Sequence, residues 1–173
     1  MEGKLKLSLV QSEIVWENID LNFAFYDELL INVQRGTDIV ILPELFSTGF
    51  TMEVGKMAER MNGKTFMWMK DTAAKYKVSV TGSFICVDNN QFYNRLLWIN
   101  QKGEYFYYDK RHLFRMGDEN LYYTPGKKRL IINYKNWRIC PLICYDLRFP
   151  VWSRNTDAYD LLIYIANWPA ARS

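Results

Sequence analysis

Hydrophobic and polar positions along the chain follow two periods, one typical of strands and the other of helices. Residues 4–11 alternate charged and apolar side chains, which predicts a strand. After Asn18, a predicted N-cap, apolar side chains recur every three or four residues and predict a helix that Gly36 ends. A second amphipathic helix is predicted over residues 64–76. We expect the inner faces of these helices in the core, and they carry Ile19, Phe23, Tyr26, Leu30, Val33, Phe66, Met69, Ala73 and Tyr76.

Short continuous apolar runs, over residues 38–45 and 160–167, predict strands that are buried on both faces. Further strands are expected at residues 78–87, 92–100, 104–109, 129–134 and 137–146. Pro141 lies inside the last of these and cannot donate a ladder hydrogen bond, so an edge or a bulge is expected there. Helices that come early and hairpins that come late predict a layered α/β or α+β fold.

Composition restricts the class of protein without naming its chemistry. The 173 residues are 49% hydrophobic, and no repeat, low-complexity segment or linker divides them, so we expect a single domain over residues 1–173. A net charge of +3 is too small to imply a nucleic-acid partner. No apolar run approaches the roughly 20 residues that span a membrane, and three cysteines make a disulfide framework improbable. We therefore expect a cytoplasmic protein without a membrane partner.

Three polar groups stand at the ends of predicted buried strands. Glu44 follows the run that ends in Pro-Glu, Lys110 follows the strand at 104–109, and Cys144 ends the run "ICPLIC". Taken alone, Glu44 and Lys110 read as surface charges. Cys144 differs from a core cysteine because charged residues follow it at once, which leaves its thiol at the edge of the sheet.

Other roles for Cys144 are weaker. Residues four apart on a strand are about 13 Å from each other, too far for Cys140 and Cys144 to share a zinc ion or a disulfide. We expect Cys86 and Cys140 in the core. A nucleophilic cysteine needs a base, which could be His112, the one histidine of the chain. The alternative base is a buried carboxylate with a nearby lysine, which Glu44 and Lys110 supply.

The segments "PEL…TGF", "YDKRHLF" and "ICYDLRFP" resemble, in this order, the three signature segments of the nitrilase, or carbon–nitrogen hydrolase, superfamily. The resemblance implies a nucleophile at Cys144, a base at Glu44 and a third catalytic group at Lys110. It also implies an auxiliary glutamate at Glu119, in "GDENLYYTPG", and an oxyanion-binding backbone N–H at Tyr145. No metal or organic cofactor is implied.

The same resemblance implies an α-β-β-α sandwich and a homo-oligomer. Members of the superfamily continue past "NWPAARS", so we expect the chain to be an N-terminal portion, with the second sheet incomplete at the C-terminus. A catalytically silent fragment with a structural or interaction role is therefore one alternative. Another is a different amidase or nitrilase activity with the same triad.

The wider sequence is most similar to the omega-amidase branch, which hydrolyses the terminal amide of 2-oxo acids such as 2-oxoglutaramate. Such substrates carry a carboxylate at the end far from the amide, so the pocket needs a cation beyond Lys110. Arg172 is the candidate for this role, because it follows the last buried strand. For Arg148 we expect a structural ion pair with Asp146 or another acid.

Overall fold

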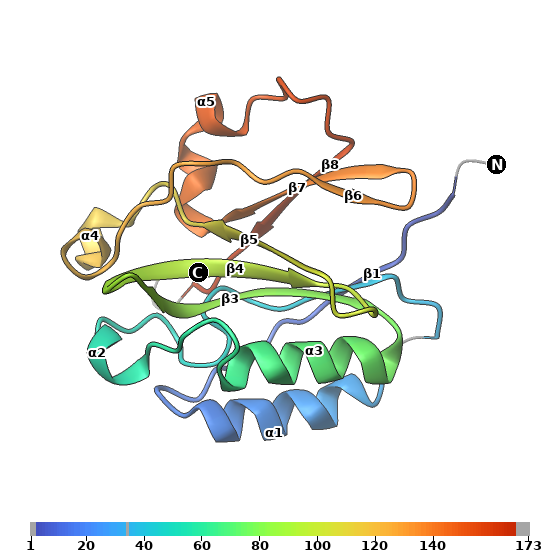
Figure 1. Cartoon of the computed structure of the whole chain (residues 1–173), viewed down its shortest axis with the longest axis horizontal. Coiled ribbons are helices and arrows are strands. Elements are labelled where there is room, and N and C mark those ends of the chain that lie inside the picture. Colours follow the sequence, from blue (N-terminus) through green and yellow to red (C-terminus); the bar gives the residue numbers. More distant parts are fainter. Residues whose placement is uncertain (1–2, 34, 169–173) are drawn as a thin grey trace.

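Two sheets and a pair of helices form three layers in the computed structural model, which describes residues 3–33 and 35–168 (Figure 1). The larger sheet has the order β1-β2-β3-β4-β5. Its strands are β1 (Leu7–Leu9), β2 (Ile39–Ile41), β3 (Ser79–Asp88), β4 (Gln91–Ile99) and β5 (Tyr105–Asp109). The smaller sheet has the order β6-β7-β8. Its strands are β6 (Ile132–Tyr134), β7 (Trp137–Ile143) and β8 (Leu161–Ile165).

Parallel and antiparallel pairs follow from the connections between strands. The chain returns through helices between β1, β2 and β3, and these strands pair in parallel. Asn89 and Asn90, both at positive φ, form a two-residue turn between β3 and β4, which therefore pair as a hairpin. In the smaller sheet β6 and β7 form a hairpin, and β8 pairs with β7 in parallel.

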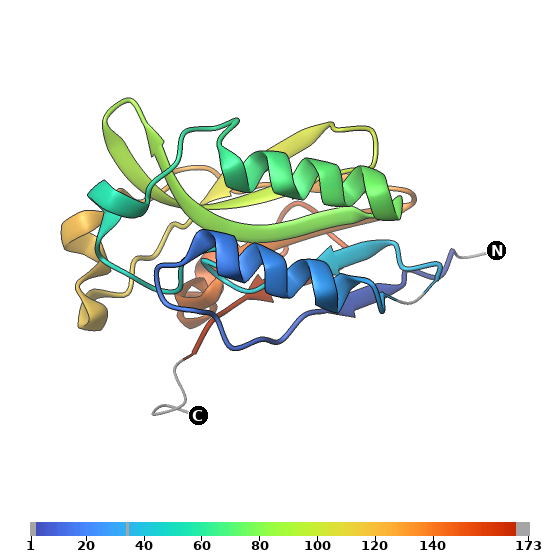
Figure 2. The ribbon, with the colours of Figure 1, turned by 90° about the horizontal axis from the view of Figure 1, so that it is seen from below.

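One face of the larger sheet is covered by α1 (Ile19–Leu30) and α3 (Lys64–Tyr76), which lie side by side (Figure 2). Asn18 caps α1, since its side chain accepts a hydrogen bond from the Leu21 N–H. The two helices meet where the rings of Phe23 and Trp68 stack with centroids 5.0 Å apart. The shorter helices are α2 (Val54–Met57), η1 (Arg115–Gly117), α4 (Glu119–Tyr122), η2 (Cys144–Arg148) and α5 (Pro150–Ser153).

The opposite face of the larger sheet packs against the smaller sheet. A buried cluster between them takes Ile41, Trp98 and Tyr108 from the larger sheet and Ile139 and Ile163 from the smaller one. The α-β-β arrangement agrees with the predicted layered fold. No described helix is both long and apolar enough to cross a bilayer.

Several helices and strands end earlier than the sequence predicted. The first helix was expected to reach Gly36 but ends at Leu30, because Asn32 and Val33 bond to the carbonyls three residues back and tighten the chain into turns. The strand predicted over 137–146 ends at Ile143, where the Asp146 carboxylate accepts the Ile143 N–H and folds the chain into η2.

Other strands are also shorter than predicted, with β1 and β2 only three residues each. Pro141 lies in the central strand of the smaller sheet, where it pairs with Ile163 of β8, so the expected edge strand is wrong; β6 pairs with β7 only as far as Ile139, and the missing N–H of Pro141 costs no bond to β6.

The inner face predicted for α3 gives a direct test of the core. Met69 is fully buried, whereas Met67 on the same helix is 44% exposed. We expect Met69→Ala to lower the free energy of unfolding by about 2–5 kcal/mol, because it leaves a cavity. Met67→Ala is the matched control and should change it by less than about 0.5 kcal/mol. Urea unfolding followed by circular dichroism measures both, and equal losses would contradict this packing.

Candidate active site

Glu44 is held in a tight turn directly after β2. Leu45 has φ +48° and donates its N–H to the Ser83 hydroxyl, at 2.9 Å, so the turn is fastened to β3. Gly82 permits this approach, because a Cβ there would lie 2.8 Å from the Cβ of Leu42. The close packing of this turn buries the Glu44 carboxylate, and the residue is only 1% exposed. A carboxylate at a strand end is thus turned into the protein.

Lys110 follows β5 directly, and two hydrogen bonds hold its backbone N–H and its backbone carbonyl. Its N–H donates to the Asn94 carbonyl at 3.0 Å, and its own carbonyl accepts from the Gly126 N–H at 2.9 Å. Gly126 is required at that position, since a Cβ would come within 2.0 Å of the Asp109 carbonyl oxygen. Lys110 is 1% exposed, and its Nζ donates hydrogen bonds to the carboxylates of Glu44 and Glu119.

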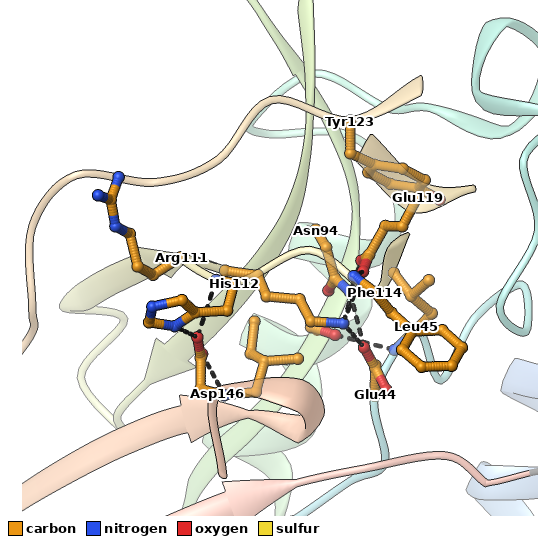
Figure 3. Close-up of polar contacts among 12 residues, drawn as sticks. Glu44, Leu45, Asn94, Arg111, His112, Phe114, Glu119, Tyr123 and Asp146 are labelled. Carbon is orange, nitrogen blue, oxygen red and sulfur yellow. Dashed lines mark hydrogen bonds and ion pairs between the residues drawn. The ribbon is translucent and has the colours of Figure 1, made fainter. Parts of the chain in front are cut away.

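A hydrogen-bonded network joins Glu44, Lys110 and Glu119 (Figure 3). The Lys110 Nζ lies 2.8 Å from Oε1 of Glu44 and 2.9 Å from Oε2 of Glu119. Glu119, the first residue of α4, also accepts the Phe114 N–H at 2.6 Å. Asn94 on β4 donates from Nδ2 to both carboxylates.

Burial and charge act in opposite directions on these groups. Burial alone would lower the pKa of Lys110, but the charges of Glu44 and Glu119 outweigh it and raise the pKa. The ammonium form is therefore strongly favoured. Burial raises the pKa of Glu119, and the charge of Lys110 works against this rise.

Cys144 stands where β7 turns into η2, in a strained backbone conformation. Its φ is +41°, a left-handed value that residues with a Cβ rarely adopt. The Asp146 carboxylate supports the turn, because it accepts hydrogen bonds from the Ile143 N–H at 3.1 Å and from the Tyr108 hydroxyl at 2.7 Å. The nucleophile candidate is thus fixed by the smaller sheet and anchored to β5.

His112 supports the same turn from outside the site. Its Nδ1 lies 2.8 Å from Oδ1 of Asp146, its backbone N–H donates to the same oxygen, and its ring stacks on Phe149. His112 does not line the cavity that holds Cys144. This position favours the carboxylate over the histidine as the base for the thiol.

A cavity of about 280 Å³ is lined by Glu44, Lys110 and Cys144. Most of its other described lining residues are apolar or aromatic: Phe50, Phe114, Met116, Tyr145, Leu147 and Trp168. Burial, followed by the charge of Glu44, raises the pKa of the Cys144 thiol to about 12, although Lys110 works in the opposite direction. The thiol is therefore protonated near neutral pH, and a group that removes its proton is needed for it to attack.

The structure brings together the four side chains singled out in the sequence as a triad and its auxiliary glutamate, and Tyr145 lines the same cavity. Cys86 and Cys140 are fully buried, as expected. Arg172 lies outside the described residues. The ion pair expected between Arg148 and Asp146 is wrong, because Asp146 is bonded to Tyr108, His112 and the Ile143 N–H instead.

Arg148 instead lines the cavity, and no described carboxylate pairs with it. Asn94 was missed altogether. Its only signal in the sequence is one amide side chain within "FYNRLLWI", at a position that the structure buries completely.

Comparison with known proteins finds relatives over almost the whole chain. The profile of the family described as "Carbon-nitrogen hydrolase" matches residues 6–172. "Omega-amidase YafV" of Escherichia coli K12 is 43% identical over 169 residues, which cover 98% of this chain and 65% of that protein. "2-oxoglutaramate amidase" of Bacillus subtilis is 29% identical, over 98% of this chain and 67% of its own length.

Among solved structures, a CN-hydrolase superfamily protein of Xanthomonas campestris matches with a TM-score of 0.92 and 44% identity, over 97% of this chain and 66% of the other. The chain thus spans 65% of the length of the Escherichia coli relative and 66% of the Xanthomonas one.

The strain at Cys144 predicts an unusual order of stabilities. Cys144→Gly should be more stable than Cys144→Ala by on the order of 1 kcal/mol, because glycine adopts positive φ without steric cost. Cys140, inside β7, is the matched control, and there glycine should be less stable than alanine by about 0.5–1 kcal/mol. Chemical unfolding of the four variants tests this, and alanine more stable than glycine at both positions would contradict a strained turn.

Proposed function

Because the chain belongs to the carbon–nitrogen hydrolase family, we propose that it is a thiol-dependent amidase of the omega-amidase type. It hydrolyses the terminal amide of a small 2-oxo acid amide, such as 2-oxoglutaramate, to the acid and ammonia. The supporting observation is the buried Glu44–Lys110–Glu119 network, of which Glu44 and Lys110 line the same cavity as the Cys144 thiol. The similarity to omega-amidase YafV supports the substrate class.

The first step is removal of the thiol proton by Glu44. Lys110 and Asn94 both bind Oε1 of Glu44, so the second carboxylate oxygen takes the proton. The sulfur then attacks the amide carbonyl and forms a tetrahedral intermediate. A protonated thiol with a raised pKa requires such a base.

The negative charge on the carbonyl oxygen is stabilised by Lys110 and the Tyr145 backbone N–H, and each such donor is commonly worth about 3 kcal/mol. Glu44 returns its proton to the leaving ammonia, and a thioester on Cys144 remains. Glu44 then activates a water molecule that cleaves the thioester. Glu119 keeps the Lys110 ammonium directed into the site through its contacts with Nζ, at 2.9 and 3.1 Å.

The far carboxylate of the substrate binds Arg148. Lys110 and Arg148 are the two cations among the described lining residues, and the Lys110 ammonium already binds Glu44 and Glu119. The guanidinium of arginine suits bidentate binding of a carboxylate. The side chain of Arg172 stays a second candidate for the same role.

The protein is also proposed to work in the cytoplasm as a homo-oligomer. The edge strand β5 supports this assembly, because its residues Tyr105, Phe106 and Tyr107 are 46%, 43% and 49% exposed. Exposed aromatic side chains on both faces of an edge that pairs with no further described strand favour contact with another subunit.

Ammonia release from 2-oxoglutaramate by the purified protein tests the proposed function. We expect Cys144→Ala and Glu44→Gln to abolish turnover, because the first removes the nucleophile and the second cannot accept a proton. His112→Asn is the control for the base, and it should keep substantial activity.

A Glu44→Gln variant that stays active while His112→Asn is inactive would support a Cys-His mechanism instead. No turnover by the unmodified protein, with 2-oxoglutaramate or with other linear amides, would support a silent structural role.

Arg148→Met tests the carboxylate site. We expect KM for 2-oxoglutaramate to rise by on the order of 10- to 100-fold, the loss of a charge-assisted pair, with hydrolysis of a small neutral amide nearly unchanged. Arg138→Met is the matched control, because Arg138 is an exposed arginine of β7 that does not line the cavity. Equal effects of Arg148→Met on both substrates would assign Arg148 to the fold and leave Arg172 as the candidate.

A further inference from the structure

Asn94 is a buried polar side chain on β4, directly before the charged Arg95. It is fully buried on β4 and faces Ile85 of β3 in the sheet register. Its backbone carbonyl holds the Lys110 N–H at 3.0 Å. Its side chain contacts both carboxylates that hold the Lys110 ammonium. One residue thus touches every charged member of the network.

The side-chain contacts close a ring of two donors and two acceptors. Asn94 Nδ2 donates to Oε1 of Glu44 at 2.9 Å and to Oε1 of Glu119 at 3.1 Å. Lys110 Nζ donates to the same two oxygens, at 2.8 and 3.1 Å. Each Oε1 therefore accepts one bond from an ammonium and one from an amide, as Figure 3 shows for the cluster around Glu44 and Glu119.

Within the part of the chain that the structure describes, the side-chain amide of Asn94 forms hydrogen bonds through its Nδ2 group and not through its Oδ1 atom. Asn94 Oδ1 is buried and has no hydrogen-bond partner among the described residues. Leaving a buried acceptor unpaired is unfavourable, so an amide in a merely structural role would be expected to use both ends. The orientation instead gives both N–H groups to the carboxylates, which favours two unprotonated acceptors.

The charges around Asn94 explain why such a donor is needed. The turn after β2 brings Glu44, α4 brings Glu119, the end of β5 brings Lys110, and η2 brings the Cys144 thiol. Tyr123 is also close enough for the charges of both glutamates to act on it. Two carboxylates thus share one ammonium in a buried site, and like charges so close favour binding of a proton by one of them.

We propose that Asn94 is a positioning residue that keeps Glu44 ready to accept the thiol proton, by donating hydrogen bonds to Glu44 and Glu119 at once. This rests on the proposed role of Glu44 as the base. Without the amide donor, the carboxylate pair binds a proton at higher pH. A carboxylate pair that already holds a proton cannot also take the proton of the Cys144 thiol.

Alkylation of Cys144 by iodoacetamide, measured against pH by peptide mass spectrometry, tests this without any substrate turnover. In the unchanged protein the rate should fall on the acid side, where the carboxylate pair takes a proton and the thiol loses its base. Asn94→Leu removes the donor and Asn94→Asp also adds a third carboxylate. This fall in the alkylation rate is the acid limb of the rate-against-pH curve. We expect it to move to higher pH by about one unit for Asn94→Leu, and further for Asn94→Asp.

Asn133→Asp is the matched control, because it adds the same charge on an exposed position of β6 and should leave the acid limb unchanged. An unshifted limb in folded Asn94→Leu and Asn94→Asp would overturn the proposal. Failure of both variants to fold, judged by circular dichroism, would also overturn it, because Asn94 would then serve the core. A shifted limb without hydrolysis of 2-oxoglutaramate would support the role of Asn94 and contradict the proposed activity.

Discussion

The site depends on one buried ammonium held between two carboxylates. Moving the charges of Lys110, Glu44 and Glu119 out of water is costly, and only close geometry with further hydrogen bonds offsets that cost. Three separate segments must therefore end at the same point: the turn after β2, the end of β5 and the start of α4. The tight contacts of Gly82 and Gly126 belong to this requirement, since each lets a neighbouring segment approach closely enough to deliver its side chain.

The nucleophile candidate comes from the other sheet, so the cavity depends on how the two sheets pack. Asp146 makes the link, because it binds the N–H at the end of β7 and the hydroxyl of Tyr108 on β5. His112 adds two further contacts to the same carboxylate, from its backbone N–H and its Nδ1. The chain thus uses its histidine to fix the turn that carries Cys144, and the network around Lys110 supplies a carboxylate as the proposed base.

Elements with a strong period were predictable from the sequence. The helix predicted over 64–76 has the bounds observed for α3, and Phe66, Met69 and Ala73 are buried as expected. Strand ends were less predictable, because hydrogen bonds to individual side chains decide them. Ser83 fastens the turn after β2, and Asp146 ends β7 by binding its last N–H.

The candidate site was predictable where charged or reactive side chains followed buried runs, as at Glu44, Lys110 and Cys144. Asn94 was not, because one amide within a strand gives no sign of which side chains will surround it. The positive φ of Cys144 and the partners of Asp146 are likewise tertiary properties. The expected ion pair of Arg148 was wrong for the same reason: nearness in sequence does not decide which charges meet.

The central claim is that amide hydrolysis passes through an acyl group on Cys144 formed with Glu44 as the base. Rapid acid quenching of the protein with 2-oxoglutaramate, followed by peptide mass spectrometry, tests it most directly. The account predicts an acyl adduct on the peptide that contains Cys144, and no adduct in Glu44→Gln. Ammonia release with an adduct on another residue, or an undiminished adduct in Glu44→Gln, would contradict it.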